Sequence, residues 1–247
     1  RLCRYQRSHQ GGNMDTISLD RRDLFRGAAA TAVAGGLLVT AGEDAHAARP
    51  TTLKQGDTGW WVQNLQQRLL KAHFWLRTAN GSYDQTTQQA VMALQKAHGL
   101  SRDGIVGPQT WSAIYKPRTP RPRTTSAFEI DKTRQLQIVA RWGWAQWVFN
   151  TSTGNGQRYW SSASGRYLYA TTPSGTFRFN RAINGMRNAP LGELWRPRYF
   201  NGGIAIHGSP SIPGYAASHG CARLSNRAIN YIWWKNLAPI GRVVKVY

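Results

Sequence analysis

The spacing of apolar and polar positions changes along the chain, from helical periodicity to short strand-like runs. Between residues 53 and 115, apolar side chains recur at intervals that place them on one face of each of three helices. These positions are Val62, Leu65 and Leu69, followed after a turn by Phe74, then Ala90, Val91, Leu94 and Ala97, and finally Trp111 and Ile114. The pattern predicts a small domain of three helices over residues 51–116, called the helical domain below.

The ends of these helices carry residues that are typical of helix boundaries. Asp57 or Thr58 is expected to cap the first helix, because short polar side chains accept hydrogen bonds from free backbone N–H groups. Gly99 is expected to end the second helix, and Pro108 to occupy the first turn of the third.

After Phe128 the apolar residues gather in short runs rich in β-branched and aromatic side chains. The runs are LQIVA, AQWVFN, RYLYA, TFRFN, GIAIHG and RVVKVY, and Gly, Pro and Asn separate them. Such runs predict strands, with one helix expected from Asn226 to Lys235. The fold class is therefore α+β, a small three-helix domain followed by a mostly β domain over residues 127–247 with one or more short helices.

The segment between the two domains has a composition of its own. It reads KPRTPRPRTTS from Lys116 to Ser126, with three prolines, four basic residues and no bulky apolar side chain. This composition predicts an extended basic linker over residues 117–126 that acts mainly as a spacer. The tryptophans of the β domain are expected mostly to pack in its core and at its edges. They are Trp142, Trp144, Trp147, Trp160, Trp195, Trp233 and Trp234.

The first 47 residues have the features of an export signal. Paired Arg21 and Arg22 precede an uncharged run rich in Ala and Gly, and Ala45-His46-Ala47 forms a small-residue cleavage motif. Paired arginines indicate the twin-arginine route, although Leu24 precedes Phe25 where the usual order is the reverse. We expect Met14 to be the start of the signal, residues 1–13 to be an upstream extension, and the mature chain to begin near Ala48 without a stable membrane span.

The charge balance points to a polyanionic partner. The 247 residues carry 32 basic and 11 acidic side chains, a formal charge of +21 at pH 7. Removal of residues 1–47 takes 6 basic and 5 acidic residues and leaves 26 against 6, so the charge belongs to the mature protein. Nucleic acid, anionic lipid and acidic polymers all fit such a charge. Nucleic acid is not expected, because no nucleic-acid motif is present and export removes the protein from it.

The β domain has few groups for catalysis. Its acids are Glu129, Asp131 and Glu193, a poor supply for a glycosidase that needs two carboxylates across one bond. Only His207, His219 and Cys221 approach the ligand set of a metal hydrolase. We therefore expect no metal or cofactor, and covalent catalysis by a thiol becomes the leading hypothesis.

Cys221 is the only cysteine left after removal of the signal, since Cys3 leaves with it. His207 lies 14 positions earlier, across a loop with two prolines, so a strand ending at His207 and a returning loop can bring imidazole and thiol together. An unperturbed thiol has a pKa of about 8.5, and His207, His219 and Arg223 can supply a base or positive charge that raises the thiolate fraction. The alternative is a buried cysteine that acts only as a small apolar residue.

Two resemblances extend over nearly all of the mature chain. The HG of IAIHG followed by SHGCAR, with STG at Ser152 and TTPSGTF at Thr171, resembles the signature of the L,D-transpeptidase catalytic family. The segments GDTGWWVQNLQQ, GSYDQTTQQAVMALQKAHGL and DGIVGPQTW resemble the three-helix peptidoglycan-binding module. Ala222 stands where the first family usually has a larger aliphatic residue, a departure that affects packing more than mechanism.

The first resemblance implies roles for individual residues. Cys221 would be the nucleophile and His207 the general base, while His219 would shape the pocket beside the thiol. The resemblance also implies a substrate-binding set in which Arg223 holds a carboxylate or braces the loop. The other members of that set are Ser218, Gly220 and Gly208.

The implied reaction is acyl transfer between stem peptides of peptidoglycan, with D-alanine released and a thioester on Cys221 as intermediate. Stem peptides, glycan strands and anionic wall polymers are the expected partners, and a carbapenem is expected to acylate the thiol.

Three alternatives stay open: an L,D-carboxypeptidase that uses water as acceptor, a sortase-like transpeptidase, and a wall-binding protein without activity. The sortase-like reading fits less well, because its cysteine sits in a different motif from SHGC.

Overall fold

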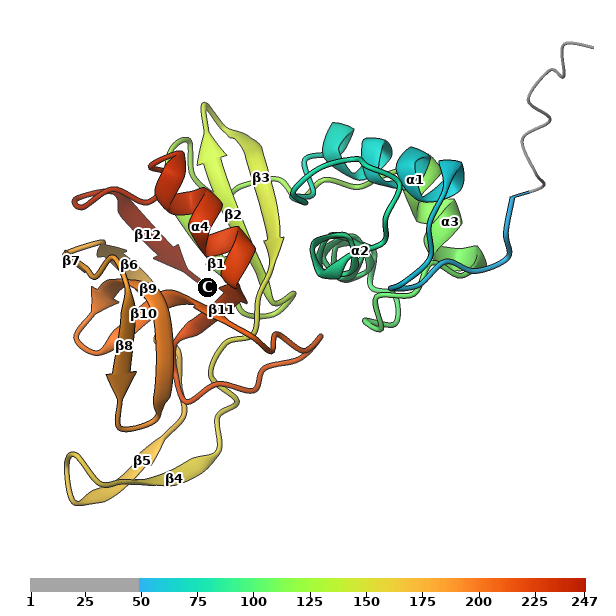
Figure 1. The fold of residues 1–247 in the computed structure, drawn as a ribbon. Helices are drawn as coiled ribbons and strands as arrows, with labels where there is room; N and C mark the ends of the chain where they lie inside the picture. Colours follow the sequence, from blue (N-terminus) through green and yellow to red (C-terminus); the bar gives the residue numbers. More distant parts are fainter. Residues whose placement is uncertain (1–48) are drawn as a thin grey trace, which may run out of the picture. The chain divides into compact units, whose positions relative to one another are not determined.

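A computed structural model of the protein describes residues 49–247, which are drawn in colour in Figure 1. The predicted export signal, with Arg21, Arg22 and the cleavage motif, lies outside the described residues. Within residues 49–247, none of the helices combines the length and the apolar character that a membrane crossing requires.

The helical domain contains the three predicted helices. They are α1 (Trp60–Lys71), α2 (Gln85–His98) and α3 (Pro108–Tyr115). The second begins at Asp84, whose carboxylate accepts a hydrogen bond from the N–H of Thr87 at 2.9 Å, a cap worth about 0.5–2 kcal/mol. It ends at Gly99 in the left-handed conformation, as the sequence predicts, because a residue without Cβ adopts a φ of 67° without strain.

The start of the first helix differs from the sequence prediction. Gly59 is its N-terminal boundary and makes no side-chain cap. The carboxylate of Asp57 accepts instead from the N–H of Lys54 at 2.8 Å and stabilises the turn that precedes the helix. Pro108 occupies the first turn of α3, which confirms the prediction for the third helix.

A five-stranded sheet forms one part of the β domain (Figure 1). Its strand order is β3-β2-β1-β12-β6. The strands are β1 (Phe128–Asp131), β2 (Leu136–Arg141), β3 (Trp144–Asn150), β6 (Gly175–Arg178) and β12 (Val243–Val246). The C-terminal strand β12 pairs in parallel with β1 and so joins the two ends of the domain.

A second sheet carries the candidate catalytic residues. Its order is β11-β10-β9-β7, and β8 pairs with β9. The strands are β7 (Arg181–Ala182), β8 (Met186–Ala189), β9 (Gly192–Asn201), β10 (Ile204–Ser209) and β11 (Ala222–Ser225). Helix α4 (Asn226–Trp234) follows β11 directly, and the hairpin of β4 (Arg158–Ser161) and β5 (Arg166–Tyr169) forms a separate two-stranded sheet. The α+β fold class is confirmed.

The helical domain packs on the β domain through a continuous apolar cluster. Leu65, Leu94 and Trp111 of the helices belong to the same cluster as Ile138 and Val148 of β2 and β3. Backbone bonds reinforce the contact, because the N–H of Trp75 donates to the carbonyl of Val148 at 3.0 Å. Phe74, which was expected on helical spacing after a turn, lies beyond the end of α1 and forms a β-bridge with Val148 of β3.

The basic segment after α3 is held in place. The hydroxyl of Thr119 donates to the carbonyl of Ala72 at 2.9 Å, at the end of α1. Farther along, the backbone N–H groups of Arg123 and Thr124 donate to the buried carboxylate of Glu129 at 3.0 and 2.7 Å. The segment is thus bound to the helical domain by the side chain of Thr119 and to the β domain by its backbone, while the basic side chains of Lys116, Arg118 and Arg121 are exposed.

The tryptophans of the β domain are divided between packing and exposure. Trp147, Trp195 and Trp233 pack against the core of the β domain, as the sequence predicts. The other four of the seven are exposed, so the packing prediction is wrong for them: Trp142, Trp144, Trp160 and Trp234. Cationic side chains lie over two of the exposed rings, Arg141 over Trp142 and Lys235 over Trp234.

Candidate active site

Strand register brings the predicted thiol and imidazole to one face of the second sheet. In the parallel pair of β10 and β11, Ile206 lies opposite Ala222 and His207 opposite Arg223. Side chains alternate between the two faces of a strand, and Ile206 and Ala222 belong to the apolar core. His207 and Arg223 therefore share the other face, and Cys221, one residue before Ala222, falls on their side.

The ring of His207 has a defined tautomer. It is 5% exposed, and its Nδ1 lies 2.9 Å from the carbonyl oxygen of Gly208. A carbonyl oxygen only accepts hydrogen bonds, so Nδ1 carries the proton and Nε2 presents its lone pair. Burial lowers the pKa of His207 to about 4, with the hydrogen bond to Gly208 acting against it and the charge of Arg223 adding to it. The imidazole is neutral at pH 7 and can act as a base.

The thiol of Cys221 is partly exposed and lies beside the turn between β9 and β10. Its Sγ is 3.8 Å from the carbonyl oxygen of Gly203. Burial raises the pKa of the thiol, whereas the N–H of Ala205 and the charge of Arg223 lower it. Among residues 49–247 no hydrogen bond joins Sγ to the ring of His207, and burial favours the neutral form of both groups because it raises the pKa of the thiol and lowers that of the imidazole.

The positive charge of Arg223 acts on both the imidazole and the thiol. It lowers the pKa of His207 and that of Cys221. Its backbone is fixed by the neighbouring segment, since its N–H donates to the carbonyl of Ser152 at 3.0 Å. Its carbonyl accepts from the hydroxyl of Thr151 at 2.7 Å. These bonds fix the backbone of Arg223 two residues after Cys221.

The loop that carries Cys221 is closed by hydrogen bonds of its own. The hydroxyl of Ser218 donates to the carbonyl of Cys221 and accepts from the N–H of Gly220 at 3.0 Å. Ser218 is 2% exposed, so its side chain is used to shape the loop. The N–H of Gly220 is occupied by the same contact, so it is not available to a ligand beside the thiol.

Thr172 also clamps this loop, although no individual role was predicted for it from the sequence. Its hydroxyl donates to the carbonyl of Gly220 at 2.6 Å and accepts from the N–H of Gly154 at 2.9 Å. Gly154 admits no larger residue, since a Cβ there would lie 2.2 Å from the carbonyl oxygen of Ala170. The segments STG and TTPSGTF, singled out only by resemblance, therefore position the loop that carries Cys221.

Gly208, a substrate-binding residue in the sequence prediction, lies where helix α4 packs on strand β10. It is buried on the core side of β10, where a Cβ would lie 2.5 Å from Oδ1 of Asn226 and 2.7 Å from Cγ2 of Ile229. The residue allows helix α4 to pack closely on the strand. Its carbonyl also accepts the hydrogen bond that orients the ring of His207.

An aromatic hairpin borders the site next to His219. The rings of Tyr159 on β4 and His219 meet edge to face with centroids 4.8 Å apart. Three further aromatic side chains of the hairpin are exposed: Trp160, Tyr167 and Tyr169. The sequence predicted β5 as a strand but not that its hairpin reaches the catalytic loop, because this contact joins residues 60 positions apart.

The described residues contain no group of three or more His, Cys, Asp or Glu side chains placed to hold a metal ion. The arrangement places a thiol and a neutral imidazole on the same sheet face, near an arginine whose charge lowers the pKa of both groups.

Comparisons with known proteins find a family match for each of the two domains. Residues 125–246 match the L,D-transpeptidase catalytic domain family, and residues 61–114 match a peptidoglycan binding domain family. The crystal structure of an L,D-transpeptidase from Xylanimonas cellulosilytica is 45% identical in sequence, with a TM-score of 0.76. The similarity covers 80% of this chain and 98% of that one, so it includes residues of both domains.

The helical domain is also similar to part of two curated proteins. An N-acetylmuramoyl-L-alanine amidase of Bacillus licheniformis is 50% identical over 66 residues, and a probable amidase of the same organism is 47% identical over 64. These matches cover about a quarter of this chain and 18% of each amidase. The similar segment is thus a module that occurs beside different neighbouring domains.

Proposed function

Because this chain belongs to the L,D-transpeptidase family, we propose that it cross-links stem peptides of peptidoglycan through a thioester on Cys221. The donor is a stem whose diamino acid is followed by a terminal D-alanine, and the acceptor is an amine of a neighbouring stem. The observation that carries the proposal is the neutral His207 on the sheet face that Cys221 also occupies.

The first half-reaction acylates the enzyme. The Sγ–H of Cys221 gives its proton to Nε2 of His207 as Sγ attacks the carbonyl carbon between the diamino acid and D-alanine. The C–N bond then breaks, and the imidazolium returns the proton to the nitrogen of the departing D-alanine. The product is a thioester between the donor stem and the sulfur.

The second half-reaction releases the enzyme. The acceptor amine attacks the thioester carbonyl, the C–S bond breaks, and the proton lost by the amine passes through His207 to the sulfur. Water in place of the amine gives the tripeptide and an L,D-carboxypeptidase. The donor half-reaction is identical in the two cases, so the balance between them depends on which acceptor reaches the thioester.

The proton transfer suits the environment of the two groups. Burial disfavours both the thiolate and the imidazolium, since it raises the pKa of Cys221 and lowers that of His207. A thiolate–imidazolium pair is therefore disfavoured before the substrate binds, and the proton moves as the new bond forms. The positive charge of Arg223 then favours the sulfur as it becomes anionic and disfavours the imidazolium.

The negative oxygen of the tetrahedral intermediate needs a donor close to the sulfur. The N–H of Cys221 is our candidate, because the neighbouring N–H of Gly220 already donates to Ser218. Loss of an oxyanion donor typically costs about 100-fold or more in rate. His219 and Tyr159 border the site on the side of the β4–β5 hairpin. In this proposal the donor stem lies against their rings.

The helical domain would hold the enzyme on its substrate. Its family match is to a peptidoglycan binding domain, and similar segments occur in proteins named as amidases of the same polymer. The proposed site of action is the cell wall or the extracellular side, which requires export. The predicted signal in residues 1–47 supplies the route in this proposal.

Incubation of the purified chain with disaccharide tetrapeptides tests the function directly. Mass spectrometry should detect cross-linked dimers and free D-alanine with the wild type and neither with Cys221→Ala. The variant should bind isolated cell walls as the wild type does, because the helical domain is unchanged. Turnover by Cys221→Ala would end the proposal, monomeric tripeptide without dimers would make the enzyme a carboxypeptidase, and no turnover by either protein would favour a binding role.

A further inference from the structure

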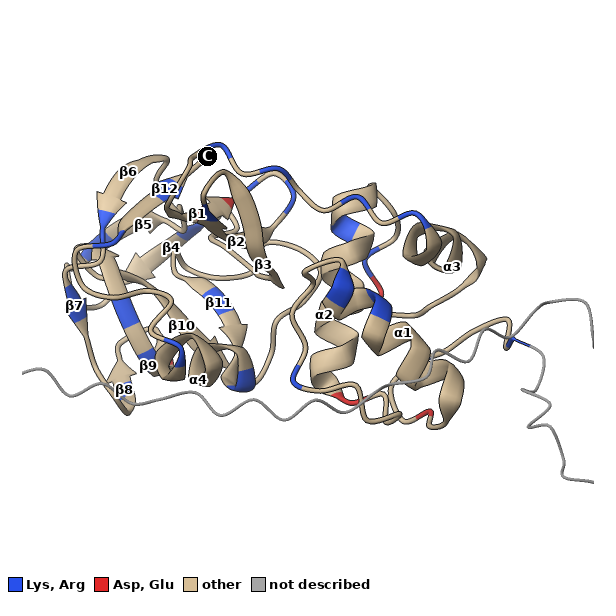
Figure 2. Ribbon diagram, turned by 90° about the horizontal axis from the view of Figure 1, so that it is seen from above, with Lys and Arg blue, Asp and Glu red and all other residues tan. Residues whose placement is uncertain are grey.

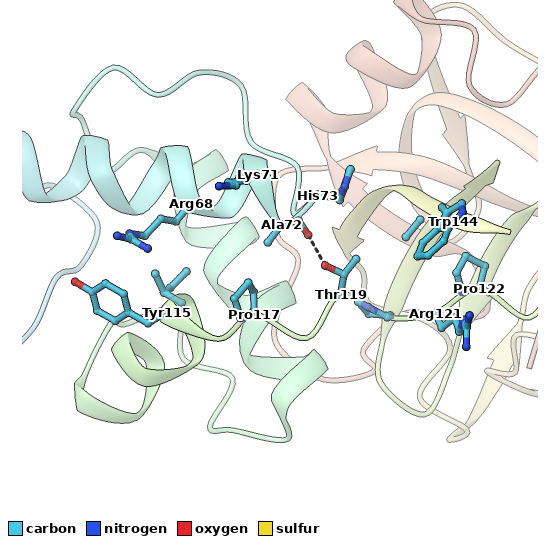
Figure 3. A pocket seen from close by; sticks show the side chains of 13 residues that line it. Arg68, Lys71, Ala72, His73, Tyr115, Pro117, Thr119, Arg121, Pro122 and Trp144 are labelled. Carbon is cyan, nitrogen blue, oxygen red and sulfur yellow. Dashed lines mark hydrogen bonds between the residues drawn. The ribbon is translucent and has the colours of Figure 1, made fainter. Parts of the chain in front are cut away.

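A hollow of about 780 Å³ lies where the two domains and the segment between them meet (Figure 3). The ends of α1 and α3 form one side, residues 117–122 cross it, and the start of β3 forms the other side. No residue of the catalytic loop lines it, and Cys221 and His207 are absent from its walls. The hollow is therefore a separate feature from the candidate active site.

The walls carry positive charge without acidic partners. Arg68 and Lys71 come from α1 and Arg121 from the connecting segment, and no Asp or Glu lines the hollow. Among residues 49–247 the ion pair found is between Arg134 and Asp131, on the β domain. Lysine and arginine are spread over both domains and acids are few (Figure 2). The charges of the hollow are thus left for a ligand or for solvent.

One of these cations is held in a defined position. The Nε of Arg68 donates to Oδ1 of Asn64 at 2.8 Å, and its guanidinium carbon lies 4.4 Å from the centre of the Tyr115 ring. A guanidinium fixed in this way loses less side-chain entropy when an anion binds. Basic residues in the last turn also suit the dipole of α1, but the dipole accounts neither for Arg121 nor for the exposed aromatic rings.

Two exposed aromatic side chains border the same hollow. Trp144 at the start of β3 is 71% exposed, and Tyr115 at the end of α3 is 43% exposed. Pro117, Pro120 and Pro122 line the space between them, and the bond from Thr119 to Ala72 fixes this stretch (Figure 3). Rigid rings and prolines offer apolar area at low entropic cost, which suits the C–H faces of a sugar or polyol.

We propose that this hollow is a second binding site, for an anionic carbohydrate segment of the cell wall. Arg68, Lys71 and Arg121 take a phosphodiester or carboxylate, and Trp144 and Tyr115 take the carbon face of the adjoining sugar or polyol. The choice of a wall polymer rests on the proposed function. A chain bound here touches the helical domain, the connecting segment and the β domain together, so it holds the enzyme on the wall independently of the donor stem.

The test uses two defined probes and the full chain. One probe is a glycerol phosphate polymer, which carries phosphodiesters, and the other is a peptidoglycan glycan strand stripped of stem peptides, which carries carboxylates. Titration calorimetry should give a dissociation constant for at least one, and the probe that binds identifies the anionic group. Lys71→Gln with Arg121→Gln should weaken that binding about tenfold, equivalent to about 1.4 kcal/mol. Trp144→Ala should weaken it as well.

The matched control removes the same charge elsewhere. Lys54→Gln with Arg187→Gln alters two exposed cations that do not line the hollow, and binding should change less than twofold. Equal weakening by the two double variants, or no binding of either probe, would overturn the proposal. Turnover of soluble disaccharide tetrapeptides should be equal in all these proteins, so loss of this site is distinguishable from failure of the proposed function.

Discussion

The ammonium group of Lys96 lies 2.9 Å from the carbonyl oxygen of Thr151, and this contact joins the two domains. Lys96 is on α2 and is 2% exposed, and it also donates to the carbonyl of Gln135 at 3.0 Å. The hydroxyl of Thr151 in turn donates to the carbonyl of Arg223, two residues after Cys221. A short chain of hydrogen bonds thus leads from the helical domain to strand β11.

Replacement of Lys96 by Met should change how stability depends on pH. Burial, and then the charge of Arg102, lower the pKa of Lys96 to about 7, whereas it is about 10.5 in the unfolded chain. Between these values the unfolded chain holds a proton that the folded chain lacks, so rising pH favours folding. The free energy of unfolding of the wild type, relative to Lys96→Met, should rise from pH 7 to pH 10.

Urea denaturation at several pH values measures this difference. Titrations common to both proteins cancel in the comparison, which leaves the slope due to Lys96. A flat difference over this range would mean that the lysine keeps its usual pKa in the folded protein, and a falling difference would mean that its pKa is raised; either result contradicts the prediction.

Thr172→Val should slow acylation without unfolding the chain. The substitution removes the hydroxyl that donates to the carbonyl of Gly220 and leaves the half-buried N–H of Gly154 without its acceptor. Such losses cost about 1–3 kcal/mol, here in the loop that holds Cys221. The rate of carbapenem acylation, followed by mass spectrometry, should fall while the circular dichroism spectrum is unchanged.

Thr171→Val is the matched control, because Thr171 is the neighbouring threonine and is exposed. Its acylation rate should equal that of the wild type. If Thr172→Val also acylates at the wild-type rate, the hydroxyl of Thr172 does not position the loop.

The helices and several strands follow from the sequence because local patterns decide them. The second helix combines a buried apolar stripe with Gly99, which adopts the left-handed conformation expected of a helix end. Strand β9 was not predicted, although it is the longest of the β domain. Its sequence GELWRPRYFN contains Pro197 and several charged residues, which argue against a strand, and Arg196 interrupts it with a φ of 49°. Its partners β8 and β10 compensate for these local costs.

The candidate site likewise has residues that the sequence predicts and contacts that it does not. Cys221 and His207 stand out because few other side chains of the β domain can carry the chemistry. The clamp by Thr172 acts across 48 positions, and the tautomer of His207 depends on the direction of one backbone carbonyl. Neither has a periodic signal in the sequence, since both arise from contacts that exist only after folding.

Gly208→Ala should destabilise the β domain. The new methyl group would lie within 3 Å of atoms of Asn226, Ile229 and Trp195, so α4 must move away from β10. Overpacking of this kind typically costs about 1–3 kcal/mol. The thermal midpoint should fall, as differential scanning calorimetry would show.

Gly185→Ala serves as the control for this change. A Cβ at Gly185 meets nothing within 4 Å, and its φ is not in the left-handed region. Its midpoint should stay near that of the wild type. Equal midpoints for the two variants would mean that helix and strand are less closely packed than these contacts indicate.

The pH dependence of acylation should reveal the lowered pKa of His207. The base must be neutral to accept the proton of Cys221, and burial lowers its pKa to about 4, below the ordinary value of 6.5. Protonation of His207 in the free enzyme should thus reduce the acylation rate only as the pH falls toward 4. An unperturbed histidine would lose half of the rate already near pH 6.5. Stopped-flow measurement of carbapenem acylation at low carbapenem concentration, from pH 4 to 8, separates the two cases. A midpoint near 6.5 would show that the ring is solvated in the free enzyme, whereas a rate that holds to pH 5 fits a buried, neutral base.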